Sequence, residues 1–356
     1  MADLSKFAVV SYKDDTGLGR QASEFRTVLG IKYQLVAPST RLPGHSLSPT
    51  TDQLLLPDCD DEILLGLLSH LHGIVILERN KWHPNLIQLA KGLGLAVVCV
   101  PNWEWFDPRD PAYQLCDLFA CLTDYTFFWL RQFGFKNAIR LPIPLDAAGL
   151  GPRRIHGPAK LFVHNAGIVD MNDRKSTYEV IRAFADVPRK DIRLIVRMQR
   201  RAYLPRVSED PRIEVRIGNL PDPRLLYIEG DAAIQPSKME GIGMMVLEPT
   251  ACGMPVITAD YPPMNEHGRG NIFVQTLPSQ EIPYPVTKGI RHAHLRIPDK
   301  AHLVSMIEWA AENDLITRSS SNLKWARHDL DPQKIKLEWH AAISEIQPSK
   351  PIQSRP

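Results

Sequence analysis

The sequence is poor in cysteine, nearly neutral in net charge and without a long hydrophobic run. Its 356 residues include five cysteines, an odd number, and none of them forms a Cys-x-x-Cys pair. Free thiols in a reducing cytoplasm are therefore expected, rather than a disulfide framework. A formal net charge of +2 is too small for a nucleic-acid-binding surface, so no nucleic-acid partner is expected. No apolar run reaches the ~20 residues that a membrane-spanning helix needs.

The start of the chain, MADLSKFAVV, also lacks the pattern of a signal peptide. It carries an acidic residue where a signal peptide has basic ones, and no long apolar core follows. We therefore expect a cytoplasmic protein. Because the sequence has no basic amphipathic helix, any membrane association is expected to be weak and peripheral, at the inner face.

What the chain does have is a regular alternation of strand and helix patterns. Short apolar runs such as IVIL (74–77) and AVVCV (96–100) are typical of strands buried on both faces of a parallel sheet. Further strands are expected at 7–11, 33–36 and 213–217, and helices are expected at 62–71, 84–93 and 222–229. The length predicts two domains of about 150 residues each. The alternation predicts a doubly wound α/β architecture.

Composition also suggests where the domains begin and end. We expect an N-terminal Rossmann-like domain at 1–145, a Gly-, Pro- and Ala-rich linker at 146–159 and a second Rossmann-like domain at 160–330. A last amphipathic helix is expected at 331–347, and the polar tail at 348–356 is expected to be disordered.

The stretch 230–266 carries the clearest chemical pattern. A short strand at 232–235 leads into a loop with the sequence EGIG (240–243), and a helix at 244–252 follows. The glycines let backbone N–H groups approach a ligand, and the positive end of the helix dipole points at the loop. The pattern therefore predicts a site for an anion such as a nucleotide diphosphate. Glu248, about one turn into the helix, is placed to reach ribose hydroxyls.

A structural explanation competes with this one for each glutamate. Acidic residues near helix N-termini are common because they oppose the macrodipole, and that accounts for Glu240. It does not account for Glu248, which lies within an apolar helix and needs a partner if it is buried.

The whole stretch resembles the donor-binding core of retaining glycosyltransferases of the GT-B fold, family 4 (glycosyl transferases group 1), whose signature is two glutamates separated by seven residues. The positions that carry the resemblance are Asp231, Pro236-Ser237, Glu240-Gly241, Gly243, Glu248, Ala251-Cys252-Gly253, Pro255-Val256 and Glu266.

This resemblance implies two Rossmann-like doubly wound domains that face a cleft, with a C-terminal helix crossing back to the first domain. It implies retaining transfer of a sugar from a nucleotide-diphosphate sugar, a UDP or GDP sugar, to an acceptor hydroxyl. The pathway would be glycan, glycolipid or glycoconjugate biosynthesis. No cofactor and no metal are implied.

The resemblance also implies roles for individual residues. Glu240 would orient the hydroxyls of the donor sugar, Lys175 would neutralise the diphosphate and Glu248 would hold the ribose. The other donor-binding residues that it implies or leaves as candidates are Gly17, Gly19, Arg20, Asn165, Arg174, Arg197, Gly218, Asn219, Leu220, Gly241, Ile242, Gly243 and Met244.

The sequence departs from the family pattern at two places. Relatives have an arginine after the first strand of the second domain, where this chain has Asn165-Ala-Gly167, so the phosphate charge would be met by Lys175 and by Arg197 or Arg20. Relatives also carry a histidine near residues 101–107, and this chain has none there.

In that second stretch, Asn102 and Glu104 are the candidates for catalytic or positioning roles, with Trp103 or Trp105 as a stacking surface. The alternative is that the aromatic residues close the domain core. Similarly, Gly17 and Gly19 either approach a ligand or make a tight turn.

Two metal-like patterns are set aside. Asp58 and Asp60 have the Asp-x-Asp spacing but lie outside the family's site, and His292 with His294 lacks a third ligand.

Two other functions stay open: a GT-B sugar-nucleotide epimerase, and a catalytically degenerate protein that binds a sugar nucleotide. The acceptor, the linkage and the oligomeric state are not indicated by the sequence.

Overall fold

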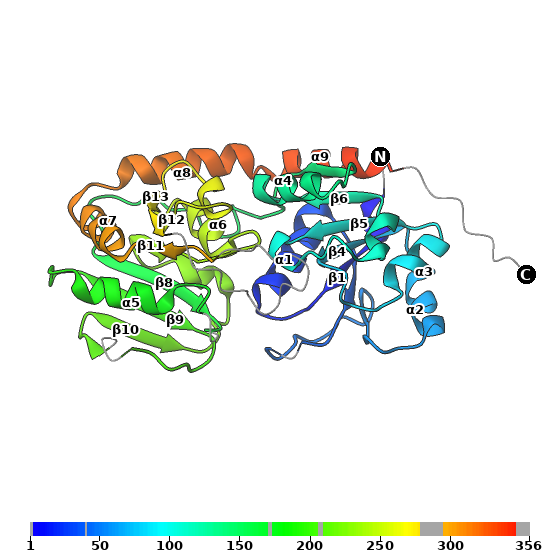
Figure 1. Cartoon of the computed structure of the whole chain (residues 1–356), viewed down its shortest axis with the longest axis horizontal. Helices are drawn as coiled ribbons and strands as arrows, with labels where there is room; N and C mark the ends of the chain where they lie inside the picture. Colours follow the sequence, from blue (N-terminus) through cyan, green and yellow to red (C-terminus); the bar gives the residue numbers. More distant parts are fainter. Residues whose placement is uncertain (1–2, 40, 170–172, 206–208, 278–294, 347–356) are drawn as a thin grey trace, which may run out of the picture. The chain divides into compact units, whose positions relative to one another are not determined.

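The computed structural model describes residues 3–39, 41–169, 173–205, 209–277 and 295–346. They form two compact units: unit 1 holds the described residues up to 146 together with 332–346, and unit 2 holds those from 147 to 331. Each unit is described by itself (Figure 1). The pair His292 and His294 and the tail 348–356 lie outside the described residues. Within the described ranges, no helix is both long and apolar enough to cross a bilayer.

Unit 1 is built on a seven-stranded sheet in which every neighbouring pair of strands is parallel. The order along the sheet is β3-β2-β1-β4-β5-β6-β7, so the winding reverses between β1 and β4. Open sheets of this kind bind ligands at the carboxyl ends of the strands at such a reversal. The strands are β1 Phe7–Ser11, β2 Tyr33–Val36, β3 Asp52–Leu54, β4 Gly73–Glu78, β5 Ala96–Pro101, β6 Leu118–Cys121 and β7 Ala138–Arg140.

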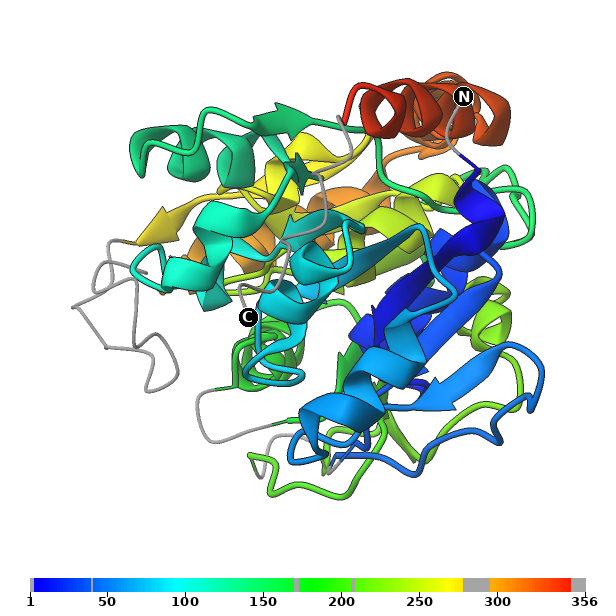
Figure 2. The same cartoon turned by 90° about the vertical axis from the view of Figure 1, so that its right-hand side faces the viewer.

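The last helix of the chain packs on unit 1. Phe25 of α1 meets Trp339 of α9 edge to face at 5.2 Å between ring centroids, and the Trp339 indole donates to the Pro142 carbonyl at 2.9 Å. In Figure 2 the red α9 lies beside the dark-blue start of the chain. The prediction that a C-terminal helix returns to the first domain is therefore confirmed. The helices of unit 1 are α1 Gly17–Leu29, α2 Asp61–Leu68, α3 Leu86–Gly92, α4 Asp124–Gln132 and α9 Pro332–Ser344.

Unit 2 repeats the same winding on a six-stranded parallel sheet with the order β10-β9-β8-β11-β12-β13. The reversal here lies between β8 and β11. The strands are β8 Leu161–Gly167, β9 Arg193–Met198, β10 Ile213–Ile217, β11 Ala232–Gln235, β12 Val256–Ala259 and β13 Ile272–Val274. The helices are α5 Thr177–Asp186, α6 Met244–Ala251, α7 Lys300–Glu312 and α8 Ile316–Asp329, and a short antiparallel pair joins β14 Thr276–Leu277 to β15 Ile297–Pro298.

Several elements differ from the sequence-based prediction. The strands β3 and β13 were not expected, because each is only three residues long. The helix expected at 222–229 is a 3-10 turn, Pro223–Tyr227 (η5). Asp222 caps this turn and Gly230, at φ +90°, ends the segment, so only a short turn forms.

The segment expected to be a linker, 146–159, is mostly packed into unit 2. Ile155 and Ala159 are buried. The Ile155 N–H donates to Ser319 Oγ at 2.9 Å, and the Ala159 N–H donates to the Ala310 carbonyl at 2.8 Å. The Gly- and Pro-rich composition thus marks an irregular segment that is nonetheless held in place.

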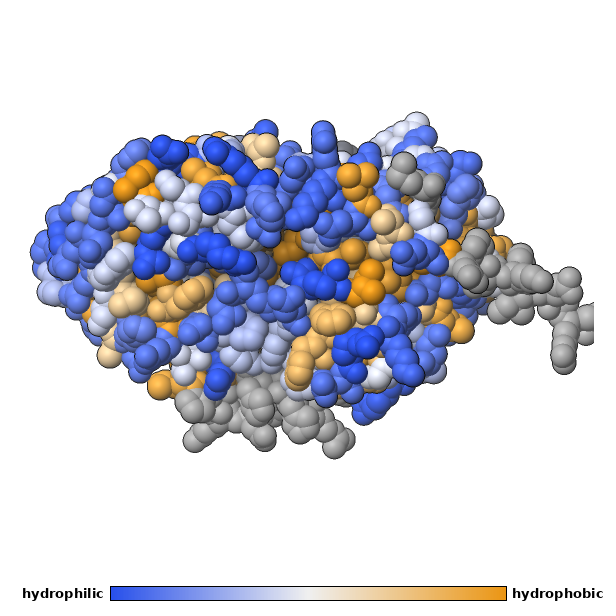
Figure 3. Space-filling model, turned by 90° about the horizontal axis from the view of Figure 1, so that it is seen from above, coloured by the Kyte–Doolittle hydropathy of each residue, from blue (hydrophilic) through white to orange (hydrophobic). Residues whose placement is uncertain are grey.

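On the face shown in Figure 3, apolar residues form several separate groups within a mostly hydrophilic surface. The large apolar side chains exposed among the described residues come from many elements, for example Ile63 of α2, Ile217 of β10 and Leu337 of α9. Scattered residues of this kind are normal for globular proteins.

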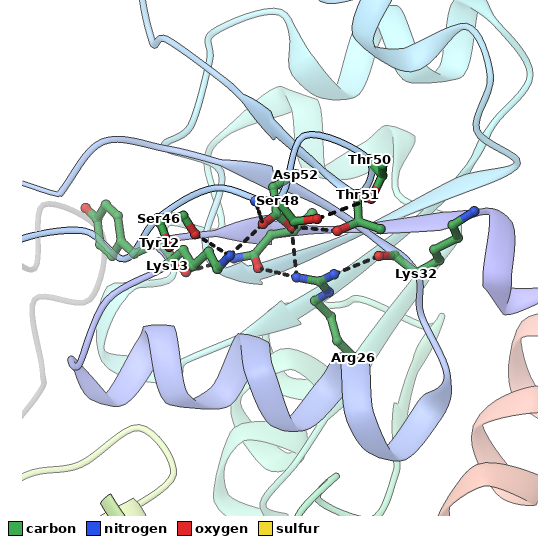
Figure 4. Close-up of polar contacts among 10 residues, drawn as sticks. Tyr12, Lys13, Arg26, Lys32, Ser46, Ser48, Thr50, Thr51 and Asp52 are labelled. Carbon is green, nitrogen blue, oxygen red and sulfur yellow. Dashed lines mark hydrogen bonds and ion pairs between the residues drawn. The ribbon is translucent and has the colours of Figure 1, made fainter. Parts of the chain in front are cut away.

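A buried carboxylate organises the start of unit 1 (Figure 4). The Asp52 side chain is fully buried, and it accepts hydrogen bonds from Lys13 Nζ at 2.6 Å, the Ser48 N–H at 2.7 Å and Arg26 Nη1 at 2.9 Å. Lys13 also donates to the Ser46 carbonyl at 2.7 Å. The network therefore ties the loop after β1 to α1, to β3 and to the loop that precedes β3.

Replacement of Asp52 by asparagine tests this network. Burial alone would raise the pKa of Asp52, but the hydrogen bonds from Lys13 and Ser48 and the charge of Arg26 outweigh it and lower the pKa below 3.8. Stability from the ionised form is therefore present above pH 3.8 and lost as the pH falls through the folded-state pKa. We expect Asp52→Asn to lower the free energy of unfolding by about 2 kcal/mol at pH 7, and by less at pH 3.5, in urea titrations.

Asp58→Asn is the control, because Asp58 is an exposed carboxylate close in sequence. Equal losses for the two variants, or a loss for Asp52→Asn that does not shrink at low pH, would contradict the role of the buried carboxylate.

Candidate functional site

The candidate residues of unit 2 gather at the carboxyl ends of β8 and β11, where the winding reverses. Two loops meet there: residues 173–176, which lead into α5, and residues 236–243, which lead from β11 into α6. The Lys238 N–H donates to the Arg174 carbonyl at 2.8 Å, and Ser176 Oγ donates to the Pro236 carbonyl at 2.7 Å. These bonds hold the two loops together.

Glu240 is the charged centre of this region. Its side chain is 6% exposed, and it forms ion pairs with Lys175 and with Arg174, the latter at 3.1 Å from Nη1 to Oε2. Burial alone would raise the pKa of Glu240, but the charges of Arg174 and Lys175 outweigh burial and lower it. The carboxylate is therefore ionised at neutral pH, and the three side chains together keep one positive charge.

The loop that carries Arg174 and Lys175 has an unusual backbone. Asp173 and Ser176 have φ values of +41° and +59°, in the left-handed region that side chains other than glycine rarely adopt. The Asp173 side chain accepts hydrogen bonds from the Thr177 and Tyr178 N–H groups at 2.9 and 2.7 Å, which caps α5 and offsets part of the backbone strain. Strain of about 1–3 kcal/mol per residue is typical of functional sites.

The glycine loop is shaped to present backbone N–H groups. Gly243 has φ +81° and is the N-cap of α6, so no side chain caps this helix end. His267, which belongs to no recognisable sequence motif, donates from Nε2 to the Ile242 carbonyl at 2.5 Å and holds the loop. The first turn of α6 is thus suited to bind an anion, as helix N-termini are.

Glu248 is 2% exposed and has a partner that the sequence did not reveal. Tyr227 of η5 donates its hydroxyl to Glu248 Oε2 at 2.6 Å. The hydrogen bond from Tyr227 thus gives the buried carboxylate of Glu248 a structural role.

Two buried amides lie towards the carboxyl ends of the neighbouring strands β8 and β11. Asn165 of β8 lies beside Arg197 of β9, and Gln235, the last residue of β11, lies beside Thr258 of β12. Asn165 is 3% exposed and Gln235 is fully buried, yet neither amide oxygen nor nitrogen of either residue has a hydrogen-bond partner among the described residues. Buried amides normally have partners, so four unpaired atoms at a ligand-binding edge fit a polar ligand. Gln235 was missed because one glutamine at the end of a strand carries no recognisable motif.

Other candidates of unit 2 have structural partners. Arg197 forms an ion pair with Glu229, which also pairs with Arg216, and burial lowers the pKa of Arg197. Asn219 accepts from Gln199 Nε2 at 3.1 Å, beside Gly218 at φ +121°. Leu220 follows in the same loop after β10.

In unit 1, the first glycines belong to the first turn of α1 rather than to a loop. A Cβ on Gly19 would lie 2.2 Å from the Asp14 carbonyl oxygen, so tight packing explains this glycine. A Cβ on Gly17 would meet nothing within 4 Å, so packing does not explain Gly17. Arg20 pairs with Glu24 at 3.6 Å.

The segment after β5 has features of both alternatives considered for it, a closure of the domain core by aromatic residues and a polar site. Trp103 is buried and packs on Tyr125 at 4.9 Å, and Phe106 is also buried, as the core alternative predicts. Glu104 is 2% exposed, and Asn102 Oδ1 is buried without a hydrogen-bond partner in the described part of the chain.

Residues 170–269 match the family model described as Glycosyl transferases group 1. No curated protein sequence matches the chain.

Solved structures match over nearly the whole chain. HepE of Anabaena, solved in complex with UDP and glucose, has a TM-score of 0.65 at 11% identity and covers 95% of this chain and 99% of its own. An α,α-trehalose-phosphate synthase from Burkholderia xenovorans has a TM-score of 0.63 at 10% identity, covering 95% and 100%. The lipopolysaccharide outer core galactosyltransferase WaaB has 0.59 at 10%, covering 95% and 99%. At such identities the likeness shows the fold, which is GT-B.

The two unpaired amides lead to a stability prediction. Gln235→Met removes a buried amide that has no partner, so we expect the free energy of unfolding to rise by about 1 kcal/mol in urea titrations. Gln34→Met is the matched control. Gln34 is also buried, but its amide donates to the Tyr12 carbonyl at 2.9 Å and accepts from Arg26 at 3.2 Å. This substitution should therefore lower the free energy of unfolding. Similar destabilisation by both variants would mean that the Gln235 amide is already satisfied in the free protein.

Proposed function

We propose that this protein is a retaining glycosyltransferase that moves a sugar from a nucleotide-diphosphate sugar to an acceptor hydroxyl in glycan, glycolipid or glycoconjugate biosynthesis. The observation that carries the proposal is the ion-paired cluster of Arg174, Lys175 and Glu240 beside the N-terminus of α6. The match of residues 170–269 to the model of Glycosyl transferases group 1 covers this cluster and supports the same activity.

The donor diphosphate is proposed to bind between the first turn of α6 and the two cations. Backbone N–H groups of Gly241 to Met244 supply hydrogen bonds, and Lys175 and Arg174 supply positive charge. These groups stabilise the leaving diphosphate electrostatically, so the transfer is proposed to need no cofactor or metal. HepE was solved with UDP-glucose, which supports UDP sugars as the first donors to test.

The proposed reaction is the front-face transfer that the resemblance to retaining GT-B glycosyltransferases implies. The acceptor hydroxyl attacks the anomeric carbon from the side of the leaving group, the bond to the diphosphate oxygen breaks, and the hydroxyl proton passes to that phosphate. Glu240 orients the sugar hydroxyls and Glu248 binds the ribose. The acceptor is proposed to bind unit 1, with Asn102 and Glu104 as positioning residues.

Donor binding is the first test. Thermal shifts with UDP, GDP, dTDP and ADP sugars should show stabilisation by one nucleotide class, and Glu248→Gln should weaken it.

Lys175→Met should lower donor affinity about 10-fold or more, because a charged hydrogen bond to phosphate is lost. Lys160→Met is the control, since Lys160 forms an exposed ion pair with Asp191. Absence of any shift from a folded protein would contradict the proposal.

Stereochemistry and acceptor dependence give the second test. Proton NMR of the product should show the anomeric configuration of the donor, and donor should be consumed only when an acceptor is present. Release of an epimerised sugar without acceptor would instead identify an epimerase. Donor binding without turnover across an acceptor panel would identify a binding protein.

A further inference from the structure

A second group of charged side chains lies at the ligand-binding edge of unit 1. It surrounds the carboxyl ends of β1 and β4, the strands between which the winding of that sheet reverses. We call it the β4-edge cluster. Its members are Tyr12, Arg41, Glu78, Arg79, Lys81, Trp82 and Trp105.

The backbone at the end of β4 is strained. Glu78 has φ +70°, and the Arg79 N–H donates to the Leu77 carbonyl at 2.9 Å, which closes a three-residue turn around Glu78. Turns of this form with a positive φ at the centre are rare, and a residue other than glycine there costs about 1–3 kcal/mol. Such strain persists mainly where function needs it. The turn reverses the chain so that Arg79 and Lys81 both reach Glu78.

Aromatic rings and one carboxylate hold the cations in place. Lys81 pairs with Glu78, and its Nζ lies 4.9 Å from the centre of the Tyr12 ring and 4.5 Å from that of Trp82. The Arg79 guanidinium lies 4.7 Å from the centre of the Trp105 ring. Contacts of this kind fix a cation without neutralising its charge.

The cluster has more positive than negative charge. Arg79 Nε is 3.6 Å from Glu78 Oε2, the same oxygen that pairs with Lys81, and it is buried without a hydrogen-bond partner among the described residues. Burial lowers the pKa of Lys81 despite Glu78, and Arg79 and Arg41 lower it further. Arg79 and Lys81 therefore share one carboxylate, and Arg41 adds a third positive charge that acts on Lys81. Another nearby carboxylate, Asp14, accepts from the Thr16 N–H and hydroxyl at 3.0 and 2.5 Å.

We propose that the β4-edge cluster binds an anionic group, a phosphate or a carboxylate, carried by the acceptor. This inference rests on the proposed glycosyl transfer for its biological meaning. Arg79 offers a planar set of donors that suits either anion, Lys81 and Arg41 add charge, and Glu78 holds Arg79 and Lys81 in position. The acceptor class is thus a phosphorylated or uronic-acid-containing sugar rather than a neutral one.

The test is calorimetric titration of the full chain, without donor, with a hexose phosphate, a hexuronic acid and the neutral hexose. We expect one of the two anionic probes to bind at least tenfold more tightly than the hexose, and the comparison identifies which anion is preferred. Arg79→Gln should weaken that binding about tenfold, and Arg41→Gln, at an exposed residue whose loss leaves the core intact, should weaken it less.

Two controls separate this site from others. Arg109→Gln removes an arginine of unit 1 that pairs with Asp107 at 2.9 Å, and it should leave binding within twofold. Lys175→Met should also leave it within twofold, because Lys175 belongs to the candidate donor site. Equal binding of the neutral and anionic probes, or loss of binding in Lys175→Met but not in Arg79→Gln or Arg41→Gln, would overturn the inference. Because no donor is present, the result is independent of whether nucleotide sugars bind.

Discussion

Burying an ionised carboxylate is costly unless nearby groups compensate its charge, and the candidate site of unit 2 depends on that compensation at Glu240. Arg174 and Lys175 provide it from the loop before α5, while Glu240 lies in the loop before α6. The ion pairs therefore join the two loops on either side of the point where the sheet reverses its winding. In the proposed reaction the incoming diphosphate takes over part of this charge balance, which leaves carboxylate oxygens for the sugar hydroxyls.

The two units have the same winding and different chemistry at the reversal. In unit 2 the edge is formed by a glycine loop, an uncapped helix end and the buried amides of Asn165 and Gln235. In unit 1 it is formed by a strained turn at Glu78 and by cations held against aromatic rings. Parallel sheets bring the carboxyl ends of all their strands to one edge, so both kinds of site follow from the same topology.

Much of the architecture could be predicted from the sequence because it depends on local patterns. The strands β1, β2, β10 and β11 have the same bounds in the structure as in the sequence-based expectation. The return of α9 was implied by the resemblance to GT-B glycosyltransferases, and Ile335, Trp339 and Ile343 of this helix are buried. Short strands such as β3 were missed, since Asp52 is buried there through ion pairs rather than through hydrophobicity.

The sequence by itself determined the α/β alternation, the glycine loop before α6 and the identity of the charged residues near it. The tertiary structure alone decided which of those groups have partners. Arg174 and Glu240 are 66 positions apart, and Tyr227 and Glu248 are 21 apart. Periodicity and capping patterns depend on residues within a turn or two of each other, whereas the balance of a buried charge depends on groups that only the folded chain brings within about 3 Å.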